Sequence, residues 1–320
     1  MSRLFTQHFF PSGGFLVRPA PSYAVTTVVS ISLVMTCFAA NSVITRYLVV
    51  GNYVTPLPLT IIRFLSGLAA LVVVSNSGRE NFRGHRASRR DILGGFFLGA
   101  YAFSISFGYS FIPAAAGALV FYSFVVLTMS SYSVAHDKEA LTFRLILGQA
   151  LGIIGVLVIT FGHVGSVSPQ GVLLMAATGV SWGLYSVYGR TFNNPFGYTY
   201  NTFLIFGVAC LLLAPSTYPL LGNGAWTGIS PYSLGLALYM GAISTALSYV
   251  LWNWTVKRLR ASQAGISQLV VPILTSVMGV FLLSEQVNAS LVMGGALVLA
   301  GIYINSNRRA KRESSVGQKE

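Results

Sequence analysis

Polar and aromatic side chains recur at helical spacing inside long apolar stretches of this sequence. In the stretch 231–255, Tyr249, Trp252 and Asn253 follow Thr245 at intervals of four, seven and eight residues, which places all four on one face of a helix. Phenol, indole and carboxamide groups in an apolar environment need hydrogen-bond partners. They find them either on a neighbouring helix or in a water-filled cavity. In a cavity, aromatic rings with amides would suit a small ligand that has both apolar and polar parts.

The same combination of groups occurs in other apolar stretches. Trp182 and Tyr185 lie three residues apart, and Asn41 precedes Thr45 by four residues, so each pair shares a helix face. The candidate ligand-binding residues are Asn41, Arg63, Tyr122, Trp182, Tyr185, Tyr249, Trp252, Asn253 and Gln268. Each of these residues alone fits a bond to a neighbouring helix, whereas the whole set favours a cavity.

Arg63 differs from the other candidates because it is charged and lies well inside an apolar stretch. A charge within a membrane is costly and is a candidate for function by default. Arg63 could bind the carboxylate of a ligand, bond to carbonyl groups at a helix end, or brace neighbouring helices. Arg46 lies at the end of an apolar stretch, from which its side chain can extend to the membrane surface.

The composition indicates an integral membrane protein. Hydrophobic residues make up 54% of the 320 residues and charged residues 8%, whereas a soluble domain carries about 25% charged residues. Ten apolar runs are long enough to be membrane-spanning helices. The runs are residues 24–49, 57–76, 91–110, 115–135, 143–163, 169–190, 198–215, 231–255, 263–283 and 289–306.

The positions of the basic residues predict the topology. The net charge of +13 would suggest nucleic acid as a partner only if it formed a patch on a folded surface. Lys and Arg occur instead in the two tails and in every second connection, while the connections 109–114, 163–169, 215–231 and 284–289 contain neither. Since basic loops stay in the cytoplasm, we expect both termini to be cytoplasmic. A lipid bilayer, as the inner or plasma membrane of the cell, is therefore the expected environment, and nucleic acid is not an expected partner.

The two halves of the chain resemble each other. Residues 139–155 align with residues 285–301 without a gap, and NSVITR at 41–46 aligns with YSVYGR at 185–190. The identical pairs are Glu139/Glu285, Leu145/Leu291, Gly148/Gly294, Ala150/Ala296, Leu151/Leu297 and Gly155/Gly301. Because each half holds five helices, the second copy must be inserted upside down, an arrangement typical of transporters. The two glutamates are expected to be structural, as helix caps or loop-fixing groups.

The second half carries a more specific motif, ASQAGISQLVVPILTSVMGVFLLSEQ at 261–286 followed by GGALVLAGIYI at 294–304. Pro272 lies in mid-helix, and Glu285 is the glutamate of a Leu-x-x-Glu helix end. With these features the motif resembles EamA-type transporters of the drug/metabolite transporter superfamily. The first half departs from the pattern, because Phe124 stands where the second half has Pro272.

The resemblance implies a ten-helix fold for residues 24–306, with a central cavity lined by helices 1, 3, 4, 6, 8 and 9 and a peripheral pair made by helices 5 and 10. The predicted fold is therefore an all-α membrane protein of ten transmembrane helices in two inverted five-helix repeats. The predicted parts are a cytoplasmic tail (1–23), a first EamA-like repeat (24–163), a second EamA-like repeat (164–306) and a basic cytoplasmic tail (307–320).

The expected function is export of amino acids or similar small metabolites by alternating access, with a small-molecule substrate and a monomer or homodimer as the working unit. Efflux of several drugs or of other small molecules is an alternative, and a receptor or scaffold without transport is an alternative of another class. No acidic residue lies deep in a predicted helix, which argues against cationic drugs and leaves no obvious proton carrier. His163, at a helix end, could titrate, but a lone histidine there also fits a solvated side chain.

An enzyme is not expected. His8, His85, His136 and His163 all lie in tails, loops or helix ends, and no HExxH motif, carboxylate pair or G-x-S-x-G motif is present. We therefore predict no catalytic residue, no metal site and no cofactor.

Overall fold

The computed structural model describes residues 21–77, 87–140, 142–161, 167–221 and 229–306, and within these ranges it contains helices and short connections but no β-strand. The predicted tails up to residue 20 and from residue 307 lie outside the described residues, as does His163. The all-helical class predicted from the sequence is confirmed for the described part of the chain.

The helices follow the predicted apolar runs closely. They are α2 (Pro21–Val50), α3 (Pro56–Ser75), α4 (Arg89–Gly108), α5 (Ala114–Ala135), α6 (Phe143–Phe161), α7 (Pro169–Arg190), α8 (Pro195–Leu221), α9 (Pro231–Tyr239), the π-helix η2 (Met240–Leu247), α10 (Ser248–Val256), α11 (Ala261–Ser267), α12 (Val270–Leu283) and α13 (Ala289–Ser306). Proline opens several of them, since its missing N–H is not needed in the first turn.

Two of the predicted runs are interrupted helices. In the run 263–283 the helix breaks between α11 and α12 at Gln268 and Leu269, because Pro272 cannot donate to the carbonyl of Gln268 and its ring clashes with that group. In the run 231–255 the helix widens to the π form over Met240–Leu247. Such π segments occur often at functional sites, and this one carries Ser244 and Thr245.

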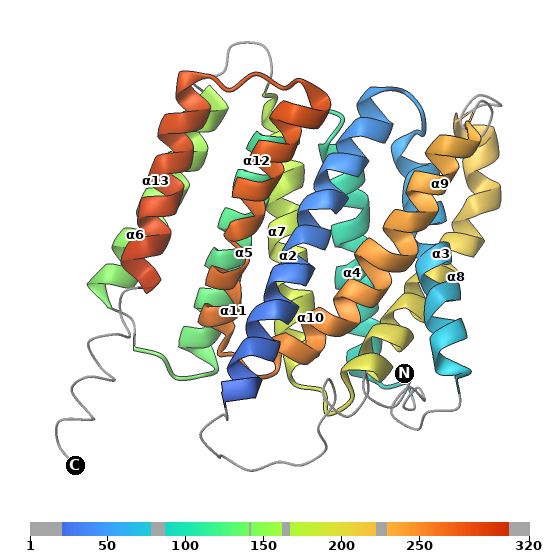
Figure 1. Cartoon of the computed structure of the whole chain (residues 1–320), viewed down its shortest axis with the longest axis horizontal. Coiled ribbons are helices and arrows are strands. Elements are labelled where there is room, and N and C mark those ends of the chain that lie inside the picture. Colours follow the sequence, from blue (N-terminus) through green and yellow to red (C-terminus); the bar gives the residue numbers. More distant parts are fainter. Residues whose placement is uncertain (1–20, 78–86, 141, 162–166, 222–228, 307–320) are drawn as a thin grey trace.

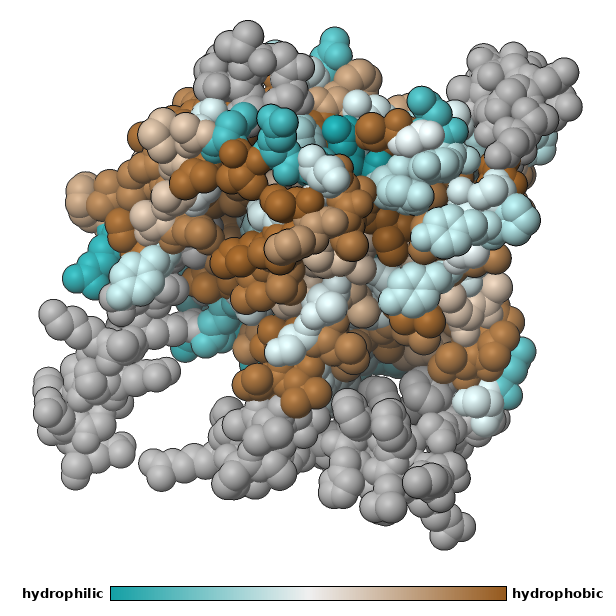
Figure 2. Space-filling view, turned by 45° about the horizontal axis from the view of Figure 1, so that its top comes forward, coloured by the Kyte–Doolittle hydropathy of each residue, from teal (hydrophilic) through white to brown (hydrophobic). Residues whose placement is uncertain are grey.

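The outer surface of the bundle is apolar. Eight helical segments of the described residues are long and apolar enough to cross a membrane, and α6 and α13 contain shorter apolar segments. Large side chains such as Phe281 (80% exposed) and Leu212 (75% exposed) point outward, and Figure 2 shows broad apolar areas on the face that it presents. An apolar surface of this extent is unfavourable in water and favourable in lipid.

Helices α6 and α13 form a pair at one edge of the bundle (Figure 1). A Cβ atom added to Gly155 would stand 2.5 Å from the carbonyl oxygen of Gly294, and one added to Gly301 would meet the carbonyl oxygen of Gly148. Small residues at these positions allow the two backbones to touch. The pair corresponds to the peripheral helices 5 and 10 that the resemblance implies.

Most residues of α5 are buried, and it packs mainly against α7, α11 and α12. The described chain begins at Pro21 and ends at Ser306 at the same end of the bundle, the lower end in Figure 1. We call this the basal end and the opposite one, where α2 ends and α13 begins, the apical end.

Candidate functional site

A small cavity lies between α2, α4, α5, α7 and α10. Its lining residues are Phe38, Asn41, Ser42, Tyr101, Ile105, Phe121, Tyr122, Trp182 and Tyr249. The free space in it is ≈ 10 Å³, about what a single water molecule needs. A ligand the size of an amino acid therefore requires these helices to move apart, and the structure is a closed conformation.

Aromatic rings form most of the cavity wall. The ring of Trp182 on α7 lies 4.6 Å from that of Tyr249 on α10 and 5.2 Å from that of Tyr101 on α4, measured between centroids. Phe38 on α2 meets Trp182 edge to face at 5.2 Å. Four helices that are distant in sequence thus contribute one apolar, polarisable surface.

Arg63 on α3 lies directly behind this wall and is fully buried. Its Nε donates to Thr245 Oγ1 at 2.8 Å, and its Nη2 donates to Tyr101 Oη at 2.9 Å and to Tyr249 Oη at 3.0 Å. These acceptors are uncharged hydroxyls. The remaining nitrogen, Nη1, has no hydrogen-bond partner among the described residues.

The π segment connects Arg63 to the polar side of the cavity. Thr245, which accepts from Arg63, donates to Asn41 Oδ1 at 3.2 Å, and Asn41 Nδ2 donates to the carbonyl oxygen of Ser244 at 2.8 Å. The segment lies close against α3, because a Cβ atom on Gly241 would meet the carbonyl oxygen of Arg63. Glycine at this position therefore lets the hydroxyl of Thr245 reach the guanidinium.

Gln268 reaches the cavity wall from the break between α11 and α12. Its Oε1 accepts from Trp182 Nε1 at 2.7 Å, so it holds the indole ring in place. The kink that Pro272 imposes thus puts a buried polar side chain next to the cavity, although the lining residues come from other helices.

Trp252 and Asn253 are buried between α10 and its neighbours α7 and α8. Trp252 Nε1 donates to Ser186 Oγ at 3.0 Å, and Asn253 Nδ2 donates to Tyr185 Oη at 3.2 Å and to Thr199 Oγ1 at 3.0 Å. For these residues the structure shows the bonds between helices that were one of the two interpretations of the sequence.

The structure brings together only part of the predicted set. Asn41, Tyr122, Trp182 and Tyr249 line the cavity. Arg63 and Gln268 bond to lining residues, and Tyr185 stacks on Trp182 at 5.4 Å. The lining residues that the sequence reasoning missed are Phe38, Ser42, Tyr101, Ile105 and Phe121. Helical spacing around Asn41 would have found Phe38, three residues earlier on the same face.

An ionic contact joins three helices at the apical end. Glu285, just after α12, accepts from the backbone N–H of Ala114 at 2.9 Å, at the first residue of α5, and from Arg46 Nε of α2 at 3.3 Å. Arg46 also donates to the carbonyl oxygen of Tyr109 at 2.6 Å. A carboxylate at a helix N-terminus is stabilised by the helix dipole. We call Arg46, Glu285 and Ala114 the apical clasp; Arg46 is thus paired rather than extended to the membrane surface.

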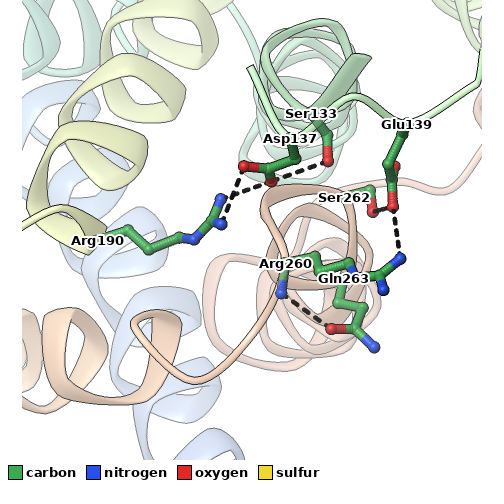
Figure 3. A network of polar contacts seen from close by, with 7 residues as sticks. All are labelled: Ser133, Asp137, Glu139, Arg190, Arg260, Ser262 and Gln263. Atoms are coloured by element: carbon green, nitrogen blue, oxygen red, sulfur yellow. Dashed lines mark hydrogen bonds and ion pairs between the residues drawn. The ribbon is translucent and has the colours of Figure 1, made fainter. Parts of the chain in front are cut away.

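A similar contact closes the basal end (Figure 3). Asp137, just after α5, accepts from Arg190 of α7 through both carboxylate oxygens, at 2.8 and 3.1 Å. Burial alone would raise the pKa of Asp137, but the hydrogen bond and charge of Arg190, with smaller contributions from Ser133 and the backbone N–H of Ala261, lower it below its ordinary value. We call Arg190, Asp137 and Ala261, the first residue of α11, the basal clasp.

Glu139 lies next to the basal clasp without joining it. It accepts from Ser262 Oγ at 3.3 Å, and its Oε1 lies 3.6 Å from Arg260 Nη1. The side chain of Arg260 is 64% exposed, so this ion pair is weak.

Comparison with known proteins shows which proteins this chain is similar to. Residues 169–307 match the EamA-like transporter family. The match, which covers the second half of the chain, agrees with the resemblance that the motif at 261–304 predicts. Together with the apolar helices it supports a multi-pass membrane protein.

Individual relatives agree with this assignment. The uncharacterized protein PA1977 of Pseudomonas aeruginosa is 29% identical over 89% of this chain and 96% of its own length. An uncharacterized transporter of Archaeoglobus fulgidus is 23% identical over 81% of this chain and 91% of its own. A crystal structure of another protein superposes with a TM-score of 0.63 at 21% identity, covering 88% of this chain and 99% of the other, and shares the fold.

Proposed function

We propose that this transporter exports amino acids or similar small metabolites by alternating access through the central cavity. The observation that carries the proposal is the position of the cavity between the two halves of the chain. The first half contributes Asn41, Tyr101 and Tyr122 to its lining, and the second half contributes Trp182 and Tyr249. A clasp closes the bundle at each end. Opening one clasp at a time would expose the cavity to one side of the membrane and then to the other.

We further propose that ten helices cross the membrane in two inverted repeats, 24–163 and 164–306. The backbone supports the relation between the two copies, because Lys138 and Ser284, which precede the aligned glutamates, both have positive φ, 54° and 53°. The N–H groups of Glu139 and Glu285 each donate to the carbonyl six residues earlier, both at 3.2 Å. Helices often end with such a bond and a left-handed residue, but that residue is usually glycine. A residue other than glycine at this position in both copies is uncommon and agrees with a repeat.

Helix packing supports the same repeat. Helix α5 packs on α7 as α12 packs on α2, and α4 packs on α7 as α10 and η2 pack on α2. Helix α3 packs on η2 as α8 packs on α4. These three contacts of one half with the other thus each have a counterpart with the roles exchanged, as a two-fold axis in the membrane plane requires.

The basal end is the cytoplasmic one in this proposal, and the membrane is the inner or plasma membrane. The basal clasp and its surroundings hold Arg190, Lys257, Arg258 and Arg260, whereas Arg46 is the basic residue of the apical clasp. Basic residues favour the cytoplasmic side.

Efflux of drugs is the second candidate function. The aromatic wall would suit apolar drugs, but cationic ones need a membrane carboxylate, and the residues that line the cavity include no Asp or Glu. A receptor or scaffold would use the same fold without moving a solute.

The test is counterflow in proteoliposomes with a panel of amino acids and with amino-acid analogues that lack one charged group, each preloaded and scored for trans-stimulated uptake. We expect at least one hit. Sealed vesicles that retain folded protein and show no trans-stimulated uptake of any compound would contradict transport of this class.

A further inference from the structure

Arg63 brings a permanent positive charge to the cavity wall without an anionic partner. Its hydrogen bonds go to the hydroxyls of Thr245, Tyr101 and Tyr249, and its Nη1 has no partner among the described residues. A guanidinium does not lose its proton in proteins. A buried charge without a counter-ion is costly, so its presence here calls for an anion that the chain itself does not supply at this position.

Tyr101 and Tyr249 connect Arg63 to the cavity through hydrogen bonds. Both hydroxyls accept from Arg63 Nη2, at 2.9 and 3.0 Å, and they bond to each other at 2.8 Å. Each hydroxyl has one proton, and the bond between them uses one of the two. Whichever tyrosine donates in that bond, one phenolic proton of the pair is left. Both residues line the cavity, so a ligand that reaches the hydroxyl pair could accept this proton in a hydrogen bond.

Asn41 adds a second donor at the same wall. Its carboxamide has two N–H groups, and one is used by the carbonyl oxygen of Ser244. Its Oδ1 already accepts from Thr245, although an amide oxygen has a second lone pair. Asn41 can therefore still donate its second N–H to a ligand at this wall.

We propose that this site binds the carboxylate of an organic anion whose aromatic or apolar body packs on Trp182 and Phe38, and that it requires no amino group on the ligand. Two donors next to a buried cation favour a charged acceptor, because hydrogen bonds to ions are stronger than those between neutral groups. The proposal rests on the proposed transport function and narrows its substrate class to carboxylates, of which amino acids are one kind.

An ammonium group finds no comparable partner. The lining residues include no Asp or Glu, and Arg63 repels a second cation in the same low-dielectric space. A carboxylate without an α-amino group should therefore bind at least as well as the matching amino acid.

The first experiment compares four ligands that share a phenyl ring on a short chain: 3-phenylpropionate, L-phenylalanine, 3-phenylpropan-1-ol and 2-phenylethylamine. Each is added to the purified full chain in detergent, and the unfolding temperature is measured. We expect the two carboxylates to raise it and the alcohol and the amine to leave it unchanged. An equal rise with the amine or the alcohol, or no rise with either carboxylate, would overturn the proposal.

The second experiment uses the proton count of the tyrosine pair. In Tyr101→Phe or Tyr249→Phe the remaining hydroxyl still accepts from Arg63 and keeps a proton for the ligand, so each single variant should bind 3-phenylpropionate nearly as well as the parent. The double variant has no phenolic proton left and should bind it roughly tenfold or more weakly. Tyr232→Phe, at an exposed position on α9, is the matched control. Independent losses that simply add in the double variant would contradict the shared-proton account.

Arg63→Gln tests the charge itself. It should abolish the preference for 3-phenylpropionate over the alcohol, and Arg63→Lys should retain part of it; an unchanged preference in Arg63→Gln would overturn the proposal. If Arg63→Gln does not fold, the tyrosine variants still test carboxylate recognition.

Counterflow distinguishes carboxylate recognition from the proposed transport function. A carboxylate that binds but is not exchanged would refute transport alone, and exchange of the amine would refute carboxylate recognition alone.

Discussion

At the apical end Glu285 connects Arg46 to the N-terminus of α5, and at the basal end Asp137 connects Arg190 to the N-terminus of α11. The sequence repeat pairs Glu285 with Glu139, yet Glu139 bonds to Ser262 beside the basal clasp. The two ends thus make the same kind of contact through acids at positions that do not align in the repeat. At each end an acid that follows one helix, α12 or α5, bonds to the first residue of a helix in the other half, α5 or α11.

The difference also predicts which end holds more tightly. The side chain of Glu285 is 14% exposed and accepts from two backbone N–H groups and an arginine. That of Asp137 is 19% exposed and accepts from an arginine through both oxygens, from Ser133 and from one backbone N–H. Less exposed ionic contacts are screened less by solvent. We expect the apical clasp to be the stronger one, so that the basal end opens more readily.

The largest effect is expected for Glu285→Gln. This variant loses the charge that holds Arg46 and the α5 N-terminus, which should favour a conformation open at the apical end by about 2 kcal/mol, or roughly thirtyfold. The measurement is the labelling rate of a cysteine introduced at Ser42, a buried residue of the cavity wall, with Cys37 and Cys210 replaced by Ala. Labelling no faster than with Glu285 present would mean that the contact does not hold the apical end.

A smaller effect is expected for Asp137→Asn at the basal end. The pair is partly exposed, so about 1 kcal/mol, or roughly fivefold in the open population, is a reasonable magnitude. A cysteine at Ser130, buried on α5, reports on this end and should label faster, while the Ser42 reporter stays unchanged. A response at both reporters would show that the two ends are not independent.

Glu139→Gln tests which acid of the basal end is the equivalent of Glu285. If contact geometry rather than sequence alignment defines this equivalent, the variant should change the free energy of basal opening by less than about 0.5 kcal/mol. The reason is that Arg260, the partner of Glu139 in its ion pair, is exposed. A larger effect for Glu139→Gln than for Asp137→Asn would favour the alignment instead.

The smallest effect concerns pH. The folded-state pKa of Asp137 is lowered, so the stability that its contact provides is present above the ordinary pKa of about 3.9 and is lost as pH falls through the lowered value. Between pH 8 and pH 5 the Ser130 reporter should label at a constant rate, after correction for thiol ionisation. A rise in this interval would assign the titration to another group of the basal end.

The sequence allowed the helices to be predicted but not the details that make the site. Apolar runs and flanking prolines locate the helices because burial in lipid and the missing proline N–H act locally. The π form at 240–247 has no comparable local signal, and it lies where Gly241 comes into close contact with α3, a helix distant in sequence. The network of Arg63, Tyr101 and Tyr249 joins residues 38 and 186 positions apart, which helical spacing within one stretch cannot relate.

Helical spacing also identified which faces of a helix are buried, but not which neighbouring helix each face packs against. Asn253 and Tyr249 share a face of α10 by spacing, yet Asn253 bonds toward α7 and α8 while Tyr249 borders the cavity. The packing of α10 against α7 and α2, and not its own sequence, makes this distinction.

The most direct test of the account links each end covalently and measures transport. In one variant cysteines replace both Arg46 and Glu285, and in a second variant they replace both Asp137 and Arg190. Both variants lack Cys37 and Cys210, and a bis-methanethiosulfonate reagent joins the two introduced cysteines. Counterflow of 3-phenylpropionate is measured on the same vesicles before linking, after linking and after reduction. We expect either link alone to stop exchange and reduction to restore the initial rate. Exchange that continues with one end linked would contradict alternating access through the central cavity.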